Sequence, residues 1–255
     1  MMNKKIVIGN WKMNPVSVKE AERLFSSVNK STTSLKKTEV VICAPFIYLE
    51  KLKKLSKKLS LGAQDAFMGD TGPFTGEVSS EMLYNLGVKY VLIGHSERRA
   101  IGEDNILINK KLKAALSSSI TPILCVGEKE RDENHEYFNV VKMQIKECLL
   151  GVNKTLFPKI IIAYEPVWAL SSTSGRRDAT AFDSSEMVIF IRKVLSDLST
   201  PDIANKMRII YGGSVNDRDA RDFLQNGGVD GVLPGKASLD PKKFVEIVKI
   251  AESIK

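Results

Sequence analysis

Eight short apolar segments, most of them rich in β-branched residues, recur along this chain and limit what it can fold into. They are mostly apolar throughout instead of alternating with polar residues, so we expect both faces of each strand to be covered. The sequence between them is long enough for helices, and strands that alternate with helices form a parallel sheet. The segments are residues 5–10, 39–43, 59–64, 89–94, 120–126, 159–165, 207–211 and 229–233.

This repeating pattern predicts an α/β fold with a closed barrel. Eight strand–helix units within 255 residues suit a (β/α)8 barrel, which typically takes about 250 residues. No low-complexity stretch, long linker or shift in composition interrupts the chain, so we expect residues 1–255 to form a single domain. An open, doubly wound sheet is the alternative, but no Gly-x-Gly-x-x-Gly motif follows the first predicted strand.

Local signals support helices between the predicted strands. Residues 17–20 (Ser-x-x-Glu) form a capping-box motif, and residues 183–186 (Asp-x-x-Glu) resemble one. A leucine stripe surrounded by lysines predicts an amphipathic helix with one solvated face. The stripe consists of Leu49, Leu52, Leu55 and Leu59.

Charge and composition argue against several classes of protein. The net charge of +8 comes largely from surface lysines, and no basic run is interleaved with aromatic residues, so we expect a mild attraction for anionic substrates and no nucleic-acid binding. No apolar run approaches the ~20 residues that span a bilayer, so we expect no membrane segment. Cys43, Cys125 and Cys148 lack the even number and the spacing of a disulfide framework, which favours reduced thiols in the cytoplasm.

Unusual polar residues stand where the predicted strands end. In a (β/α)8 barrel the carboxyl ends of the strands meet at one rim, where the chemistry takes place. Lys12, His95 and Glu165 end or follow the first, fourth and sixth segments, and glycine-containing loops at 211–214 and 233–236 follow the seventh and eighth. Glycines there let backbone N–H groups approach an anion. The pattern therefore predicts an acid, an imidazole and an ammonium group around one small anionic substrate.

Each of these residues also has a structural explanation when it is taken alone. Glu165 closes an apolar strand and precedes Pro166, which stiffens the exit, so it suits either a general base or a satisfied strand-end carboxylate. A histidine is often a structural hydrogen-bonding group, and we expect His135 to be a solvated one. The shared rim favours the functional interpretation, and no histidine or cysteine spacing suggests a metal site.

At these same positions the chain resembles the triosephosphate isomerase family. The similar segments run in order from about residue 3 to the C-terminus. They are 10–14 (NWKMN), 62–65 (GAQD), 74–77 (FTGE), 94–99 (GHSERR), 163–168 (AYEPVW), 211–215 (YGGSV) and 230–231 (DG). The resemblance implies a TIM barrel that interconverts dihydroxyacetone phosphate and D-glyceraldehyde 3-phosphate through an enediolate, in glycolysis and gluconeogenesis, without a cofactor.

The resemblance also implies a role for each residue of the site. Glu165 would be the base, neutral His95 would hydrogen-bond the developing enediolate, and Lys12 would supply fixed positive charge. The backbone around residues 96–97 would hold one ring nitrogen of the histidine. The other substrate-binding residues would be Asn10, Glu97, Ser214, Gly235 and Lys236. A lid would comprise Pro166, Val167, Trp168, Ser171, Ser172, Thr173, Ser174 and Gly175.

A further implication concerns the assembly of the protein. The stretch 65–77 resembles the protruding loop by which members of this family form homodimers, and it is rich in residues that shape loops, such as Gly72 and Pro73. Thr75 would then touch the catalytic region of the partner subunit. An ordinary surface loop is the alternative interpretation of this stretch.

Two segments depart from the family pattern. Residues 169–179 (ALSSTSGRRDA) are about three residues longer than the usual lid and lack its leading glycine, and a tip without glycine adopts a positive φ only at a cost. Serine hydroxyl groups or the Arg176 guanidinium are candidates to replace the missing phosphate contact. At 233–236 (LPGK), Pro234 has no N–H, and the Lys236 side chain either assists the phosphate or points to solvent. We expect the chemistry to be kept and the lid to close less tightly.

Three other functions fit parts of the pattern. A phosphosugar sensor on the same barrel is compatible with the altered lid, but a sensor has no need of a base such as Glu165. A pentose-phosphate epimerase would place metal ligands at the rim, and the sequence shows none there. A nucleic-acid-binding role rests on the net charge alone, and salt-dependent retention on DNA would reveal it.

Overall fold

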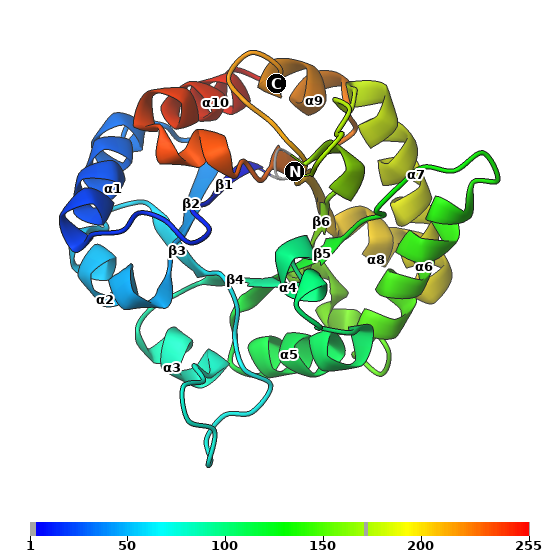
Figure 1. The fold of residues 1–255 in the computed structure, drawn as a ribbon, viewed down its shortest axis with the longest axis horizontal. Coiled ribbons are helices and arrows are strands. Elements are labelled where there is room, and N and C mark those ends of the chain that lie inside the picture. The colour runs from blue at the N-terminus through cyan, green and yellow to red at the C-terminus, as the bar shows by residue number, and fades with distance from the viewer. Residues whose placement is uncertain (1–3, 171–172, 255) are drawn as a thin grey trace.

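The computed structural model of the chain describes residues 4–170 and 173–254. Within them, eight parallel strands close into a barrel in chain order, with β8 paired to β1 (Figure 1). The strands are β1 (Lys5–Asn10), β2 (Thr38–Cys43), β3 (Ser60–Ala63), β4 (Tyr90–Ile93), β5 (Thr121–Val126), β6 (Ile161–Tyr164), β7 (Arg208–Tyr211) and β8 (Gly231–Val232). The predicted closed (β/α)8 barrel is confirmed, and the alternative of an open sheet is wrong.

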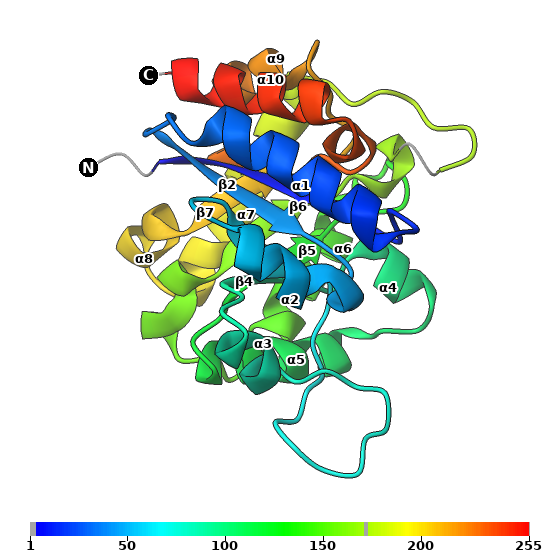
Figure 2. The same cartoon turned by 90° about the vertical axis from the view of Figure 1, so that its left-hand side faces the viewer.

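Helices form a ring around the barrel, and Figure 2 shows α1 between α10 and α2 on its outside. The α-helices are α1 (Val18–Thr32), α2 (Phe46–Leu55), α3 (Ser80–Asn85), α4 (Ser96–Ala100), α5 (Asn105–Ser117), α6 (Glu136–Cys148), α7 (Ala181–Leu198), α8 (Pro201–Lys206), α9 (Ala220–Asn226) and α10 (Pro241–Ser253). The 3-10 helices are η1 (Lys154–Lys159), η2 (Val167–Ala169) and η3 (Lys236–Leu239). Within the described part of the chain, none of these helices is both long and apolar enough to cross a membrane.

Some strand ends differ from the prediction for local reasons. β1 covers the predicted residues 5–10, but β6 is shorter than the predicted 159–165 because Lys159 still belongs to η1. β8 covers two of the predicted residues 229–233. It lies between a turn at Gly228, where φ is +70°, and Pro234, which has no N–H for a sheet hydrogen bond.

The helix starts confirm one expected cap and correct another. The Ser17 hydroxyl accepts a hydrogen bond from the Glu20 N–H at the start of α1. The predicted cap at Asp183 is wrong, because Thr180 is the N-cap of α7 and the Asp183 carboxylate accepts the Thr180 N–H. Asp183 thus completes a capping box from the third helical position. The predicted leucine stripe is also wrong at its end, since Leu59 lies beyond α2.

Both faces of the sheet are buried against apolar side chains. Residues that alternate along the strands form one cluster. Its members are Ile6, Ile8, Val41, Cys43, Tyr90, Leu92, Ile123, Cys125, Ile161, Ala163, Ile210 and Leu233. The residues between them, such as Val7 and Ile42, belong to a second cluster with the surrounding helices. Burial on both faces explains why the strands are apolar throughout, and it leaves the rim of the barrel for polar groups.

The connection from β3 to α3 projects from the body of the barrel (Figure 2). It contains residues 65–77, and the rings of Phe67 and Phe74 pack against each other within it, tilted by 45° and with their centroids 4.5 Å apart. Phe74 remains exposed, as does Met68 nearby. A projecting loop with exposed apolar side chains is typical of a contact surface.

Candidate active site

A cavity of about 780 Å³ opens at the carboxyl ends of the strands. Among the residues that line it are Asn10, Lys12, His95, Glu165, Ser214, Gly235 and Lys236, all of which the sequence analysis proposes for the site. Glu97, the remaining predicted substrate-binding residue, forms an ion pair with Lys12. The fold therefore gathers the predicted side chains at one place, and the roles assigned to them stay predictions.

Glu165 stands just past β6 with its carboxylate in the wall of the cavity, and it is only 2% exposed. The Ser96 N–H donates a hydrogen bond of 3.0 Å to its Oε2. Its Oε1 lies 3.3 Å from Nε2 of His95, and among the described residues this oxygen has no hydrogen-bond partner. An unsatisfied buried carboxylate oxygen is costly, but it keeps a lone pair available for a proton.

His95 is fixed by the first turn of the helix that follows it. It occupies the N-cap of α4, and the Glu97 N–H donates to its Nδ1 over 3.2 Å. A ring nitrogen that accepts a hydrogen bond carries no proton, so we infer that the ring is neutral with its proton on Nε2. The histidine thus presents an N–H donor beside Glu165, in agreement with the expected hold on one ring nitrogen.

Lys12 has a strained backbone that its neighbours hold in place. Its φ is 53°, a left-handed conformation that costs a residue with a side chain about 1–2 kcal/mol. The Lys12 N–H donates to Oδ1 of Asn10 over 2.9 Å, and Nε2 of Gln64 donates to the Lys12 carbonyl over 2.9 Å. Its Nζ lies 2.5 Å from Oε1 of Glu97. In the sequence Gln64 stands out only as part of the 62–65 motif, and no local pattern indicates this role.

The loops after β7 and β8 form another part of the cavity wall. The Ser238 hydroxyl lies 2.6 Å from the Gly235 carbonyl and 3.1 Å from the Asn10 carbonyl, so it ties the β8 loop to β1. A Cβ atom at Gly235 would lie 3.3 Å from Cε of Lys12, which shows how closely the lysine stem approaches this loop. The Ser214 hydroxyl is buried and unpartnered among the described residues, and such a group beside a cavity suits a ligand.

The first part of the predicted lid is anchored to the loop after β5. Nε1 of Trp168 and the Tyr164 hydroxyl donate to Oε1 of Glu128 over 2.7 and 2.8 Å. The Val167 N–H donates to the Glu128 carbonyl over 2.9 Å. Burial raises the pKa of Glu128, although these side-chain hydrogen bonds act in the opposite direction. The first lid residues, Pro166 to Trp168, are therefore held in place by these hydrogen bonds to Glu128.

The described middle of the lid consists of residues 173–175. The Thr173 hydroxyl donates to the Val167 carbonyl over 2.6 Å and fixes the described start of this stretch. Ser174 and Gly175 lie in a turn, and Gly175 has a φ of +67°. Gly175 therefore supplies a left-handed conformation just after the serine-rich run. Ser171 and Ser172 lie outside the described residues.

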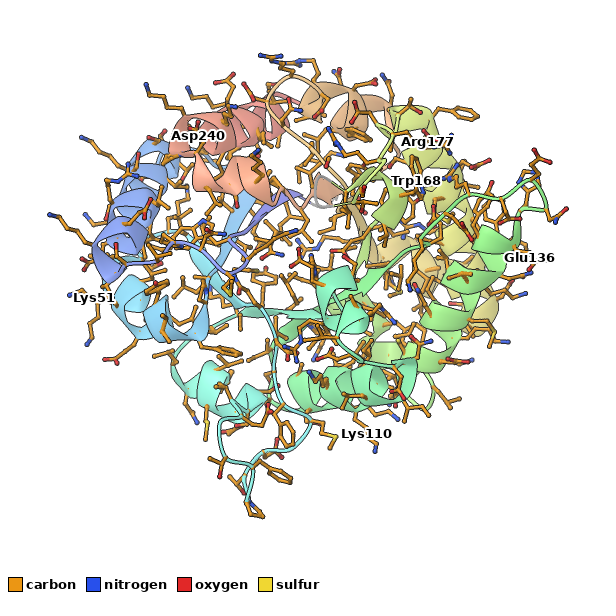
Figure 3. The ribbon with its side chains drawn as sticks, in the orientation of Figure 1. Lys51, Lys110, Glu136, Trp168, Arg177 and Asp240 are labelled. Atoms are coloured by element: carbon orange, nitrogen blue, oxygen red, sulfur yellow. The ribbon has the colours of Figure 1, made fainter. Side chains whose placement is uncertain are left out.

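Two arginines that the sequence analysis does not assign to the site contact the lid tryptophan. The guanidinium of Arg177 lies 4.4 Å from the centroid of the Trp168 ring, and Figure 3 shows the two side chains next to each other. The guanidinium of Arg131 lies 5.3 Å from the same ring. Both distances fall in the range of cation–π interactions. No spacing in the sequence links these arginines to Trp168, so only the fold reveals the contact.

A (β/α)8 barrel with a carboxylate, an imidazole and an ammonium group at its mouth is typical of barrel enzymes that move a proton on a small anion. The family model described as triosephosphate isomerase matches residues 5–251, and the chain belongs to the triosephosphate isomerase family.

Curated proteins named triosephosphate isomerase resemble the chain over nearly its whole length. The protein of Dictyoglomus turgidum is 40% identical over 97% of this chain and 100% of its own length. That of Dictyoglomus thermophilum is 41% identical with the same coverage. That of Aquifex aeolicus is 43% identical over 96% of this chain and 98% of its own length.

Proposed function

We propose that this chain, acting as one domain of residues 1–255 in the cytoplasm, interconverts dihydroxyacetone phosphate and D-glyceraldehyde 3-phosphate in glycolysis and gluconeogenesis. One observation carries the proposal. Lys12, His95 and Glu165 come from three different strand ends and line one cavity, with Nε2 of His95 3.3 Å from Oε1 of Glu165. The family membership and the names of the relatives support it.

The chemistry moves one proton between two neighbouring carbons. Glu165 takes the proton from the carbon beside the carbonyl group, and that C–H electron pair becomes the double bond of an enediolate while the carbonyl pair moves onto oxygen. The Nε2 proton of His95 passes to that oxygen, and the ring takes back the hydroxyl proton of the neighbouring carbon. Glu165 then returns its proton to the former carbonyl carbon, so the double-bond pair forms the new C–H bond and the O–H pair left on the neighbouring oxygen forms the new carbonyl group. A positioned base of this kind contributes about 10²–10⁴-fold in rate, and no redox cofactor is required.

Fixed charge lowers the energy of the enediolate. The ammonium group of Lys12 faces the developing negative charge, and a preorganised donor of this kind is worth roughly 3 kcal/mol. Glu97 holds the ammonium group before substrate binds, with Nζ 2.5 Å from its Oε1. Asn10 keeps the strained Lys12 backbone in place and orients the substrate oxygens.

The phosphate group gives the substrate its place in the cavity. In this proposal the backbone N–H groups of Ser214, Gly235 and Lys236 donate to the phosphate oxygens. Pro234 supplies no N–H, which makes the two donors after it more important. The lid, Pro166 to Trp168 with residues 171–175, covers the bound substrate and excludes water.

We also propose that the chain forms a homodimer through the segment 65–77. Met13 and Val16 are each 92% exposed, and Phe74 in the projecting loop is 45% exposed. Exposed apolar side chains that gather near a site mark a contact surface. Thr75 would reach the catalytic cavity of the partner subunit.

A coupled assay with D-glyceraldehyde 3-phosphate tests the proposed function directly. The wild-type chain should turn over this substrate, and Glu165→Gln should lower kcat by about 10²–10⁴-fold without unfolding the protein. The exposed carboxylate of Glu246 in α10 lies outside the cavity, so Glu246→Gln is a control for the loss of one negative charge. Absence of turnover by the wild-type chain would overturn the proposal, and near-normal activity of Glu165→Gln would remove Glu165 as the base.

A further inference from the structure

The longer lid carries an ion pair at the same cavity as the proposed catalytic residues. Nη1 of Arg176 lies 3.1 Å from Oδ1 of Asp178, and both residues line the cavity. The Arg176 side chain is 39% exposed, whereas that of Asp178 is 83% exposed. The arginine is thus the more covered member of the pair. Neither residue takes part in the proton transfer described above.

Charged side chains of both signs surround the cavity. The cations are Lys12, Arg176, Arg218, Lys236 and Lys243, and the carboxylates are Glu165, Asp178, Asp217, Asp219 and Asp240. Two of the carboxylates cap local backbone: Asp219 accepts the Asn216 N–H over 2.8 Å, and Asp240 accepts the Lys242 N–H over 2.9 Å. Asp178 differs from them because its partner is itself a cation at the cavity.

The negative charge of Asp178 acts on titratable groups in and beside the loop after β7. Burial raises the pKa of Asp219, and the charges of Asp178 and Asp217 raise it further. Burial also raises the pKa of Tyr211, the last residue of β7, and Asp178 is again among the charges that act in the same direction. Asp178 therefore repels negative charge beside the loop that carries Ser214.

We propose that Arg176 is a specificity-determining residue that binds the phosphate dianion of the substrate, and that Asp178 is the acceptor the phosphate displaces. The inference rests on the proposed function. It assigns to the Arg176 side chain the phosphate contact that the missing leading glycine of the lid would otherwise provide. A guanidinium group donates two parallel hydrogen bonds to phosphate, which carries about −1.5 to −2 charges near neutral pH. The exposed Asp178 carboxylate is readily hydrated, so giving up this surface ion pair costs little.

Substitutions of Arg176 and of Asp178 should change the inhibition by inorganic phosphate in opposite directions. Arg176→Gln should weaken inhibition by inorganic phosphate about tenfold or more, because hydrogen bonds to a charged group are lost. It should lower kcat/KM for D-glyceraldehyde 3-phosphate by a similar factor and leave turnover of unphosphorylated D-glyceraldehyde unchanged. Asp178→Asn removes the competing and repelling carboxylate, so it should tighten phosphate inhibition by about threefold. In the double variant that gain should disappear.

Arg221→Gln is the matched control, because Arg221 is exposed on α9 and outside the cavity lining. It makes the same change in charge and should leave all three quantities unchanged. The inference is overturned if Arg176→Gln keeps phosphate inhibition within about twofold of this control, or if both aldehydes lose activity equally. If inorganic phosphate inhibits Asp178→Asn more weakly than it inhibits the wild-type chain, Asp178 is not the acceptor that phosphate displaces.

Failure of the proposed function gives a different result. In that event the wild-type chain does not turn over D-glyceraldehyde 3-phosphate at all, and calorimetric titration with inorganic phosphate replaces the kinetic readout. If the wild-type chain then binds phosphate more tightly than Arg176→Gln does, Arg176 binds the anion even though the chain is not an isomerase. Equal binding by the two proteins overturns the inference.

Discussion

The backbone of Glu165 passes so close to Gly127 that a Cβ atom added at Gly127 would lie 1.8 Å from the Glu165 carbonyl oxygen. Gly127 follows β5 and Glu165 follows β6, so two neighbouring strand ends touch through backbone atoms. The Glu165 N–H also donates to the Val126 carbonyl over 2.8 Å. The position of the proposed base is therefore set by the adjacent strand end as well as by its own.

Gly127→Ala should damage both stability and activity. The atom that its Cβ would meet belongs to the backbone, so no flexible side chain can move away, and overpacking of this kind costs about 1–3 kcal/mol. A displacement of the base by about 1 Å is enough to lower kcat by about 10²-fold. Urea unfolding and the coupled isomerase assay would measure the two losses. A variant with wild-type kcat would show that this contact does not position Glu165.

Gly212→Ala offers a comparison at the side chain of the same residue. A Cβ atom there would lie 2.8 Å from Cγ of Glu165, which is a side-chain atom, and 3.3 Å from the Tyr164 carbonyl oxygen, which is a tight contact but far less severe than the 1.8 Å at Gly127. We therefore expect kcat to fall about tenfold or more while the free energy of unfolding changes less than in Gly127→Ala. If Gly212→Ala were the less stable of the two variants, the distinction between backbone and side-chain contact would be wrong.

The fold was accessible from the sequence because it rests on repeated local patterns. Apolar strands at regular intervals predict a parallel sheet covered on both faces, and eight of them close into a barrel. The shortened β6 and β8 were not accessible, since their ends depend on η1, on a glycine turn and on Pro234. The cap of α7 was misplaced because Thr180 and Asp183 satisfy each other, and both are good capping residues.

The site was only partly accessible from the sequence. Lys12, His95 and Glu165 stand out because charged or titratable groups at the ends of apolar strands are unusual. The contacts that hold these three side chains cannot be recognised in the same way. Ser96 acts on Glu165 through its backbone N–H, and Gln64 acts on Lys12 from another strand end, so neither contact depends on a spacing along the chain. Interactions between distant residues without a periodic signal require the folded structure.

The cysteines give a prediction about reactivity and alkaline pH. Burial raises the pKa of the Cys148 thiol to about 11, and burial also raises the pKa of Cys43 and Cys125. A chromogenic disulfide reagent at about pH 8 should therefore react with none of the three thiols until the protein is unfolded. Rapid reaction of one thiol in the native protein would contradict this.

The raised pKa of Cys148 also determines how the free energy of unfolding changes at alkaline pH. Above the ordinary thiol pKa of 9.0 the unfolded chain releases protons that the folded chain retains, so the free energy of unfolding should fall as the pH rises toward the folded pKa of about 11. Cys148→Ala removes one of these protons and should make the decline shallower. Denaturant unfolding at a series of alkaline pH values would measure the slope, and an equally steep decline in the variant would show that Cys148 does not contribute.

Gln64 gives the most direct test of how the Lys12 backbone is held. Its Nε2 donates to the carbonyls of Lys12 and Cys43 over 2.9 and 3.0 Å, so it joins the ends of two strands at a residue whose φ is strained. Gln64→Leu keeps a side chain of similar size but leaves both carbonyls without this donor. Loss of one partner from a buried hydrogen bond costs about 1–3 kcal/mol, and because these two bonds are only partly buried we expect a loss near the lower end of that range.

We expect Gln64→Leu to lower the free energy of unfolding by that amount and to lower kcat/KM for D-glyceraldehyde 3-phosphate about tenfold or more, since the ammonium group of Lys12 loses its fixed position. Gln225→Leu is the control, because Gln225 is exposed on α9, and it should change stability by no more than about 0.5 kcal/mol. The activity loss should be larger than the stability loss explains at temperatures where the protein stays folded. If activity per folded molecule were unchanged, Gln64 would stabilise the barrel without positioning Lys12.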